Sequence, residues 1–167
     1  ASKPASFSGR YGSPAFPKML STKSRLLTSD PGAKNRISID ISGVNPGTFD
    51  THANQTTMFP KLWSEVTNAV SAFYQDLKEH QANEEVVILM FTEFGRRVKE
   101  NGSGTDHGSG GVAFVIGDAV KGGLYGEYPS LAPEKLDEGD LQWSNDFRGT
   151  YATLLEQWMG LDAKAIL

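Results

Sequence analysis

The sequence predicts an α/β domain whose mainly parallel sheet is covered by helices. Three observations support this prediction: an unbroken apolar run at 86–91, an amphipathic stretch at 58–80 and an alternating run at 36–42. A run that is apolar at consecutive positions is typical of a strand buried on both faces, as in parallel sheets packed between helices. A strand, a long helix and a second strand in this order predict a right-handed βαβ unit.

The N-terminal third is expected to contribute a helix and a strand to this domain. Residues 1–13 are rich in Ser, Gly and Pro and lack periodicity, so we expect an extended arm or the remnant of a missing N-terminal part. The single α/β domain then spans 14–167. Its first elements are a modest helix at 14–29 and the strand at 36–42, where isoleucine occupies every second position.

The central part alternates between regular elements and links. Apolar residues at three- and four-residue spacing predict a long helix at 58–80. A polar link follows at 81–85, and the apolar run at 86–91 comes next. The stretch at 102–111 contains five glycines and predicts a loop, after which residues 112–116 predict a third short strand.

Much of the C-terminal third lacks periodicity. Residues 121–126 predict a turn-rich hairpin or loop, and 129–145 predict an irregular, acidic excursion over the surface. Residues 146–159 show the spacing of an amphipathic helix, which Gly160 is suited to end.

Composition excludes several classes of protein. A length of 167 residues suits one domain with a core of its own. The formal net charge of −4 argues against a general nucleic-acid binder, which usually presents a basic face. The absence of cysteine removes disulfides and thiolate chemistry. No apolar run approaches the roughly 20 residues that a membrane-spanning helix needs.

Asp50 and His52 follow the predicted strand at 36–42 and are the first candidate metal ligands. A carboxylate and an imidazole two residues apart in a loop can converge on one divalent ion. The alternative is that Asp50 is a turn residue and His52 a capping or surface histidine. Asn54 and Gln55 could hydrogen-bond to such ligands, although both residue types are also common near helix starts.

Asp106 and His107 form a second acid–imidazole pair, in the middle of the glycine-rich loop. Glycine lets the backbone approach an ion closely, but a flexible linker has the same composition. The third histidine, His80, ends the predicted long helix, where the helix dipole favours a solvated imidazole.

Charged residues also crowd the end of the apolar run. Glu93 is either a metal ligand or the ion-pair partner of Arg96 or Arg97. Arg96, Arg97 and Lys99 could bind a phosphate or sulfate group. The alternative is a solvated, salt-bridged turn. A nucleotide-binding glycine loop is disfavoured because no G-x-x-x-x-G-K-[ST] pattern occurs.

Three segments resemble signature sequences of one bacterial family. They are FDTHANQ at 49–55, FTEFGRRVKENGSGTDHG at 91–108 and VKGGLYG at 120–126. The family is the domain-of-unknown-function family fifteen-oh-one (DUF1501), described as sulfatase-like and placed in the alkaline phosphatase superfamily. The resemblance covers about residues 14–167 and corresponds to the C-terminal portion of the family.

This resemblance implies a three-layer α/β/α sandwich, possibly incomplete, that holds divalent metal ions. Zinc is the first expectation, with manganese or calcium as alternatives. The metal ligands implied by the resemblance are Asp50, His52, Glu93, Asp106 and His107. Arg96 would contact the oxyanion of a phosphate or sulfate ester. Such a metallohydrolase would be active only where the N-terminal nucleophile region is supplied.

The resemblance also bears on partners and location. The implied partners are the missing N-terminal portion or a second copy of the chain, together with a small phosphate or sulfate ester. Nucleic acid and a membrane span are not expected. The implied location is periplasmic or secreted. The alternative function is a non-catalytic α/β module for binding or assembly in an exported complex.

Overall fold

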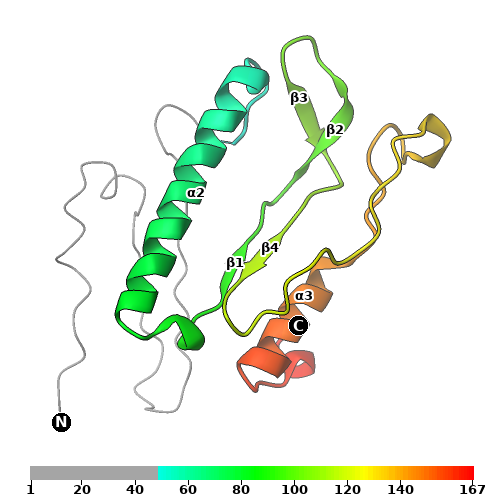
Figure 1. Ribbon diagram of the computed structural model, residues 1–167. Coiled ribbons are helices and arrows are strands. Elements are labelled where there is room, and N and C mark those ends of the chain that lie inside the picture. Colours follow the sequence, from blue (N-terminus) through cyan, green and yellow to red (C-terminus); the bar gives the residue numbers. More distant parts are fainter. Residues whose placement is uncertain (1–48) are drawn as a thin grey trace.

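The computed structural model describes residues 49–167, which form one long helix, two small sheets and a C-terminal helical segment (Figure 1). The predicted arm at 1–13, helix at 14–29 and strand at 36–42 lie outside the described residues. Between 49 and 167, no helix has the length and apolar character required to cross a membrane.

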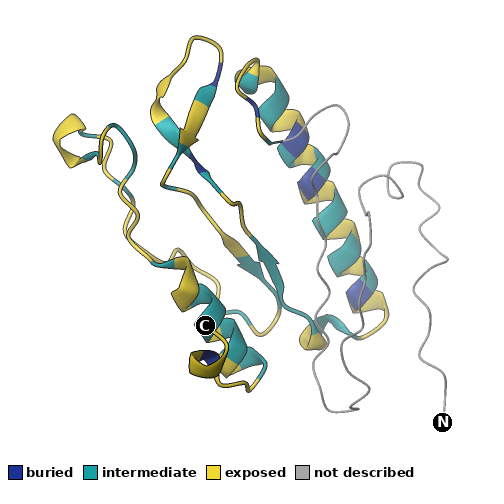
Figure 2. Cartoon of the chain, turned by 180° about the vertical axis from the view of Figure 1, so that it is seen from behind, coloured by how far each residue is buried: buried dark blue, intermediate teal, exposed yellow. Residues whose placement is uncertain are grey.

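The long helix is α2, Gln55–Glu79. It confirms the prediction for 58–80 and begins three residues earlier. Its buried residues Leu62, Val66 and Leu77 lie on one stripe, as the sequence spacing indicated. Figure 2 shows these buried positions alternating along α2 with exposed ones. The helix ends where His80 takes a non-helical conformation, and the short 3-10 helix η1, Asn83–Glu85, follows.

Four aromatic side chains form contacts at the first turns of α2. Through them, the segment before α2 and a strand later in the chain pack against this helix. Phe49 contacts Phe59 and Trp63 edge to face, with ring centroids 5.5 and 5.2 Å apart. Trp63 contacts Phe114 in the same way at 5.7 Å. Such contacts add to the free energy gained by burying the rings. Phe49 directly precedes Asp50, so this packing fixes the position of the first candidate metal ligand.

The described strands pair in antiparallel fashion. β1, Ile88–Met90, pairs with β4, Phe114–Ile116, and Leu89 lies opposite Val115. β2, Gly95–Glu100, pairs with β3, Thr105–Gly108. In Figure 1 the two pairs follow one another along a single long arm, with β2 and β3 at its far end.

These pairings confirm a mixed α/β fold but do not support the predicted mainly parallel sheet. The chain leaves β1, turns within the arm and returns as β4, so these two strands form a hairpin. The predicted βαβ unit is not tested, because its first strand, at 36–42, lies outside the described residues. The apolar run at 86–91 is also not the strand buried on both faces that we expected. β1 is half-buried along its length, and Phe91 beyond it is 61% exposed.

The glycine-rich stretch at 102–111 differs from the predicted loop. Its residues Thr105–Gly108 form β3, and the turn of the hairpin lies before them. Glycine makes the tight pairing possible because a Cβ on Gly108 would lie 2.6 Å from the carbonyl carbon of Arg96. Close backbone approach, and not linker flexibility, therefore accounts for glycine at positions 104 and 108.

The C-terminal helical segment confirms the prediction for 146–159. It consists of α3, Phe147–Thr153, followed without interruption by a π-helical turn, η3, Leu154–Trp158. Asp146 caps it by accepting a hydrogen bond of 2.9 Å from the amide of Arg148. Gly160 follows with a φ of +67°, the conformation expected of a helix-ending glycine.

The segment between β4 and α3 is irregular and mostly exposed, as predicted for 129–145. It contains the 3-10 helix η2, Pro133–Lys135, and an isolated bridge between Asp137 and Asp140. Residues 121–126 form bends without strand pairing, so the loop alternative applies there. A last 3-10 helix, η4, spans Ala163–Ala165.

Candidate metal centre

The turn of the β2–β3 hairpin packs against the backbone that leads into α2. The amide of Gln55 donates a 3.1 Å hydrogen bond to the carbonyl of Ser103. A Cβ on Gly104 would lie 2.6 Å from the carbonyl oxygen of His52, so only glycine fits there without a shift. This close approach places the hairpin beside the Asp50–His52 segment.

Asp50, His52 and His107 meet at this contact. One ligand atom from each lies within 4.8 Å of the other two. Asp50 Oδ1 is 2.7 Å from His107 Nε2 and 3.0 Å from His52 Nε2. All three side chains are about half exposed. Thr51 between the first two is buried, as expected where successive side chains of an extended chain point to opposite sides. Two residue pairs that are distant in the sequence thus share one site.

Stacking fixes the second imidazole. The ring of His107 lies parallel to that of Phe94, with centroids 3.7 Å apart and an interplanar angle of 12°. The two histidine rings are 4.8 Å apart. Phe94 was not among the predicted site residues. Its one signal in the sequence is its place: this aromatic residue directly precedes β2, and the strand that pairs with β2 carries His107.

Asp106 lies on the other side of His52. Its Oδ1 is 3.2 Å from His52 Nδ1, whereas Asp50 faces Nε2 of the same ring. Asn101 donates a 2.9 Å hydrogen bond from Nδ2 to the same Asp106 oxygen. Asn101 was also missed by the sequence analysis, although an Asn-Gly pair is a known hairpin-turn signal.

Hydrogen bonds to the two carboxylates favour their charged forms. The pKa of Asp50 is lowered mainly by its hydrogen bond with His107, and nearby His52 acts in the same direction. The pKa of Asp106 is lowered first by the hydrogen bond from Asn101 and then by that from His52. Both carboxylates are therefore ready to act as acceptors or ligands at neutral pH.

Two of the predicted charged residues have other positions. Glu93 is exposed and does not belong to the three-residue group. Arg96 is half-buried and donates hydrogen bonds to the carbonyls of Phe49 and Thr105, the first of which precedes Asp50. Arg96 therefore ties the loop to the hairpin, and its contact with an oxyanion stays a prediction.

Other predicted residues have structural partners. Arg97 Nε lies 3.2 Å from Asp140 Oδ1, so this arginine forms an ion pair with the acidic excursion and not the predicted one with Glu93. Gln55 accepts a 3.0 Å hydrogen bond from the hydroxyl of Thr105. His80 is exposed at the end of α2, as expected, with Nδ1 3.5 Å from Asp76.

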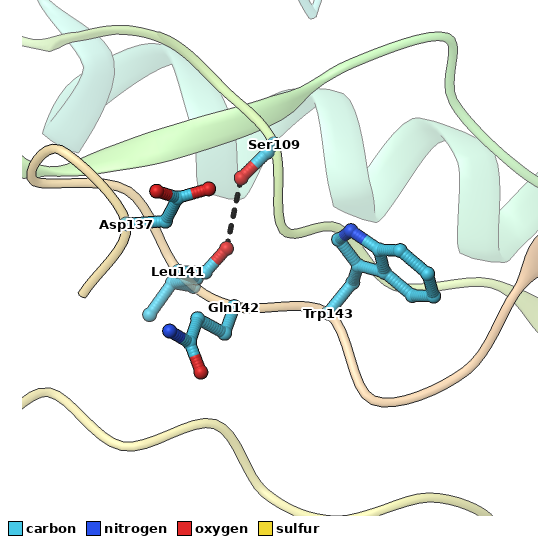
Figure 3. A pocket seen from close by; sticks show the side chains of 5 residues that line it. All are labelled: Ser109, Asp137, Leu141, Gln142 and Trp143. Atoms are coloured by element: carbon cyan, nitrogen blue, oxygen red, sulfur yellow. Dashed lines mark hydrogen bonds between the residues drawn. The ribbon is translucent and has the colours of Figure 1, made fainter. Parts of the chain in front are cut away.

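A shallow pocket lies beyond the end of β3, two residues after His107 (Figure 3). The hydroxyl of Ser109 donates a 2.8 Å hydrogen bond to the carbonyl of Leu141, which holds the two segments together. The residues that line the pocket are Ser109, Asp137, Leu141, Gln142 and Trp143. The pocket is open to solvent, and its wall is mostly polar.

A family model matches most of the chain. The model of a family described as "Protein of unknown function (DUF1501)" matches residues 33–166. No curated protein and no solved structure matches the chain. The match agrees with the signature segments at 49–55 and 91–108.

Proposed function

Because the chain belongs to the DUF1501 family, we propose that it carries the metal-binding part of a hydrolase for phosphate or sulfate esters. In this proposal Asp50, His52 and His107 hold one divalent ion. The observation that supports it is the convergence of their three ligand atoms within 4.8 Å, from a loop and a hairpin far apart in the sequence.

The distances between these atoms fit an ion of the size of zinc. Zinc binds nitrogen and oxygen ligands at about 2.0–2.2 Å, so two ligands of one tetrahedral ion are about 3.3–3.6 Å apart. Asp50 Oδ1 lies 2.7 and 3.0 Å from the two imidazole nitrogens. Each separation needs to widen by less than about 1 Å, which side-chain rotation can supply.

The donor set favours zinc over the alternatives. Two imidazoles and one carboxylate suit zinc and similar transition metals, whereas calcium and magnesium prefer oxygen ligands. Three protein ligands with solvent access match catalytic zinc sites, which keep a fourth position for water or substrate. All three side chains are about half exposed. A bound zinc ion would lower the pKa of a coordinated water and polarise an ester oxygen.

The remaining residues of the site would hold these ligands and offset charge. Two neutral imidazoles and the Asp50 carboxylate leave a divalent ion with one positive charge. Asp106, which lies 3.2 Å from the far nitrogen of His52, would offset that charge. Phe94 holds the plane of His107, and Arg96 holds the loop before Asp50. The nucleophile and the rest of the active site would come from an N-terminal portion, as the superfamily resemblance implies.

Zinc binding to the purified chain tests this proposal. Competition with a chromophoric chelator should give one zinc per chain, and His107→Ala should weaken binding at least 100-fold because a ligand is lost. His80→Ala is the matched control, since His80 is also an exposed histidine beside an aspartate, at the far end of α2. Binding that is absent, or equally weakened by both substitutions, would contradict the proposal.

A second candidate is a non-catalytic module for binding or assembly. The observation that favours it is the exposure of large apolar side chains between β4 and α3, including Leu124 and Tyr128, which are more than 90% exposed. Under this alternative, replacing Asp106 and His107 by Ala should leave partner binding unchanged in a pull-down with the family's N-terminal portion. A loss of binding in that variant would count against it.

A further inference from the structure

The Asn101–Asp106 pair carries an inference that rests on the proposed metal site. We propose that Asp106 is a positioning residue, which orients the His52 ring for metal binding, and that Asn101 holds Asp106 in place. This assigns Asp106 a different role from the direct ligand that the family resemblance implies.

The two nitrogens of His52 face different carboxylates. Nε2 is 3.0 Å from Asp50 Oδ1, and Nδ1 is 3.2 Å from Asp106 Oδ1. The nitrogens of one imidazole point away from each other, so a single ion cannot bind both. Because Asp50 and His107 lie on the Nε2 side, an ion shared with them binds Nε2. Asp106 is therefore behind the ligand and not beside the ion.

The contact with Asp106 also fits the tautomer of His52 that metal binding requires. An ion on Nε2 takes the lone pair of that nitrogen, so the hydrogen of the neutral ring is on Nδ1. Asp106 Oδ1, 3.2 Å from Nδ1, can accept a hydrogen bond from it. A carboxylate that accepts from the far nitrogen of a metal-bound histidine fixes the ring and raises its basicity.

Asn101 connects this arrangement to the fold of the hairpin. Its Nδ2 donates to Asp106 Oδ1 at 2.9 Å and to the carbonyl of His52 at 3.1 Å. Its Oδ1 accepts from the amide of Gly104 at 3.0 Å, which closes the turn between β2 and β3. One side chain thus binds the turn, the positioning carboxylate and the backbone of the ligand.

A matched pair elsewhere in the chain provides the control. Asn83 donates a hydrogen bond to Asp118, another aspartate whose pKa is lowered by side-chain hydrogen bonds, in a contact that joins η1 to the turn after β4. The same substitutions at this pair remove an Asn–Asp hydrogen bond without touching the metal ligands, and Asp118→Ala also removes the hydrogen bond that Tyr74 donates. A loss of zinc affinity that follows substitution of Asn101 or Asp106, but not of Asn83 or Asp118, then indicates the positioning role.

The test measures zinc affinity and the visible spectrum of the Co²⁺-substituted chain. Asp106→Ala should weaken zinc binding about 10-fold, the lower end of the range for such partners because Asp106 is 58% exposed. The stoichiometry and the Co²⁺ band positions should stay unchanged. Asp106→Asn should fall between wild type and Asp106→Ala, since it keeps an acceptor without the charge. Asn101→Asp should weaken binding, while Asn83→Asp and Asp118→Ala should not.

Each outcome has one meaning. Affinities of the Asp106 variants equal to wild type would overturn the positioning role. A loss as large as that of His107→Ala, with a shifted Co²⁺ spectrum, would instead make Asp106 a ligand. A wild-type chain that binds no zinc would refute the proposed function. The positioning role, which needs a bound ion, would fall with it.

Discussion

Substitution of Gly104 by Ala should disturb both the stability of the hairpin and the proposed metal site. A Cβ at this position would lie 2.6 Å from the carbonyl oxygen of His52 and 2.8 Å from its carbonyl carbon. Ordinary contact begins at about 3.4 Å, so the turn and the loop must separate by about 0.8 Å. The atoms in conflict belong to the backbone, so no side-chain rotation relieves the clash.

The magnitude follows from this displacement. Overpacking of this kind typically costs about 1–3 kcal/mol of the free energy of unfolding. The shift also exceeds the tolerance of about 0.2 Å in metal–ligand distances, so zinc affinity should fall at least 10-fold. Urea denaturation gives the first quantity, and chelator competition gives the second.

Gly122→Ala is the control for this substitution. Nothing lies within 4 Å of a Cβ at Gly122, so the same change of residue should leave stability and zinc affinity unaltered. If Gly104→Ala behaved like Gly122→Ala in both assays, the packing of the hairpin turn against His52 would be wrong, and the reasoning about the metal site would lose its basis.

Three further predictions concern contacts around and beyond the site. Phe94→Ala removes the ring stacked on His107 and should weaken zinc binding about 3- to 10-fold in chelator competition. Phe94→Tyr keeps a ring and should preserve the affinity, so equal affinities of the two variants would contradict this role of Phe94. Hydrogen bonds with Arg148 lower the pKa of Asp146 to about 2 from its ordinary 3.8, so its stabilising effect should be present above about pH 4 and lost as the pH falls toward 2. Asp146→Asn should therefore melt below wild type at pH 7, and this difference in melting temperature should shrink at acidic pH; a difference that grows there would refute the assignment. Arg97→Ala removes the ion pair with Asp140 and the hydrogen bond to the carbonyl of Glu138, so limited proteolysis near 138–140 should become faster. The free energy of unfolding should change by less than about 1 kcal/mol. An unchanged cleavage pattern would show that other contacts hold this segment.

The sequence predicted those parts of the fold that depend on local periodicity. The apolar stripe that includes Leu62, Val66 and Leu77 extends over several turns, and only a helix places such residues on one face. The C-terminal helix was predicted for the same reason, with its end at Gly160. The strand at 112–116 was also predicted, and the structure shortens it to Phe114–Ile116.

Strand pairing could not be predicted in the same way. An apolar run such as 86–91 indicates a strand but does not show which strand it pairs with or in which direction. Here the chain reverses through the β2–β3 hairpin, so β1 meets β4 in antiparallel orientation. The composition of the glycine-rich stretch is shared by linkers, and its role became clear only from the lack of space at Gly104 and Gly108.

The sequence named residues that meet at the candidate site but did not predict how their side chains are arranged there. Acid–imidazole pairs beside turns are visible in a sequence, which is why Asp50, His52 and His107 could be named. The position of Asp106 behind His52 depends on the direction of one imidazole ring, which no residue pattern records. Asn101 and Phe94 act through hydrogen bonding and stacking, and residue types that do so occur throughout any chain.

Anomalous diffraction at the zinc absorption edge, from crystals of the chain grown with zinc, would locate the ion. We expect one strong anomalous peak at about 2.0–2.2 Å from Asp50 Oδ1, His52 Nε2 and His107 Nε2, with Asp106 on the far side of His52. Anomalous density confined to other positions, such as His80 and Asp76, or an empty site between the three side chains would contradict it.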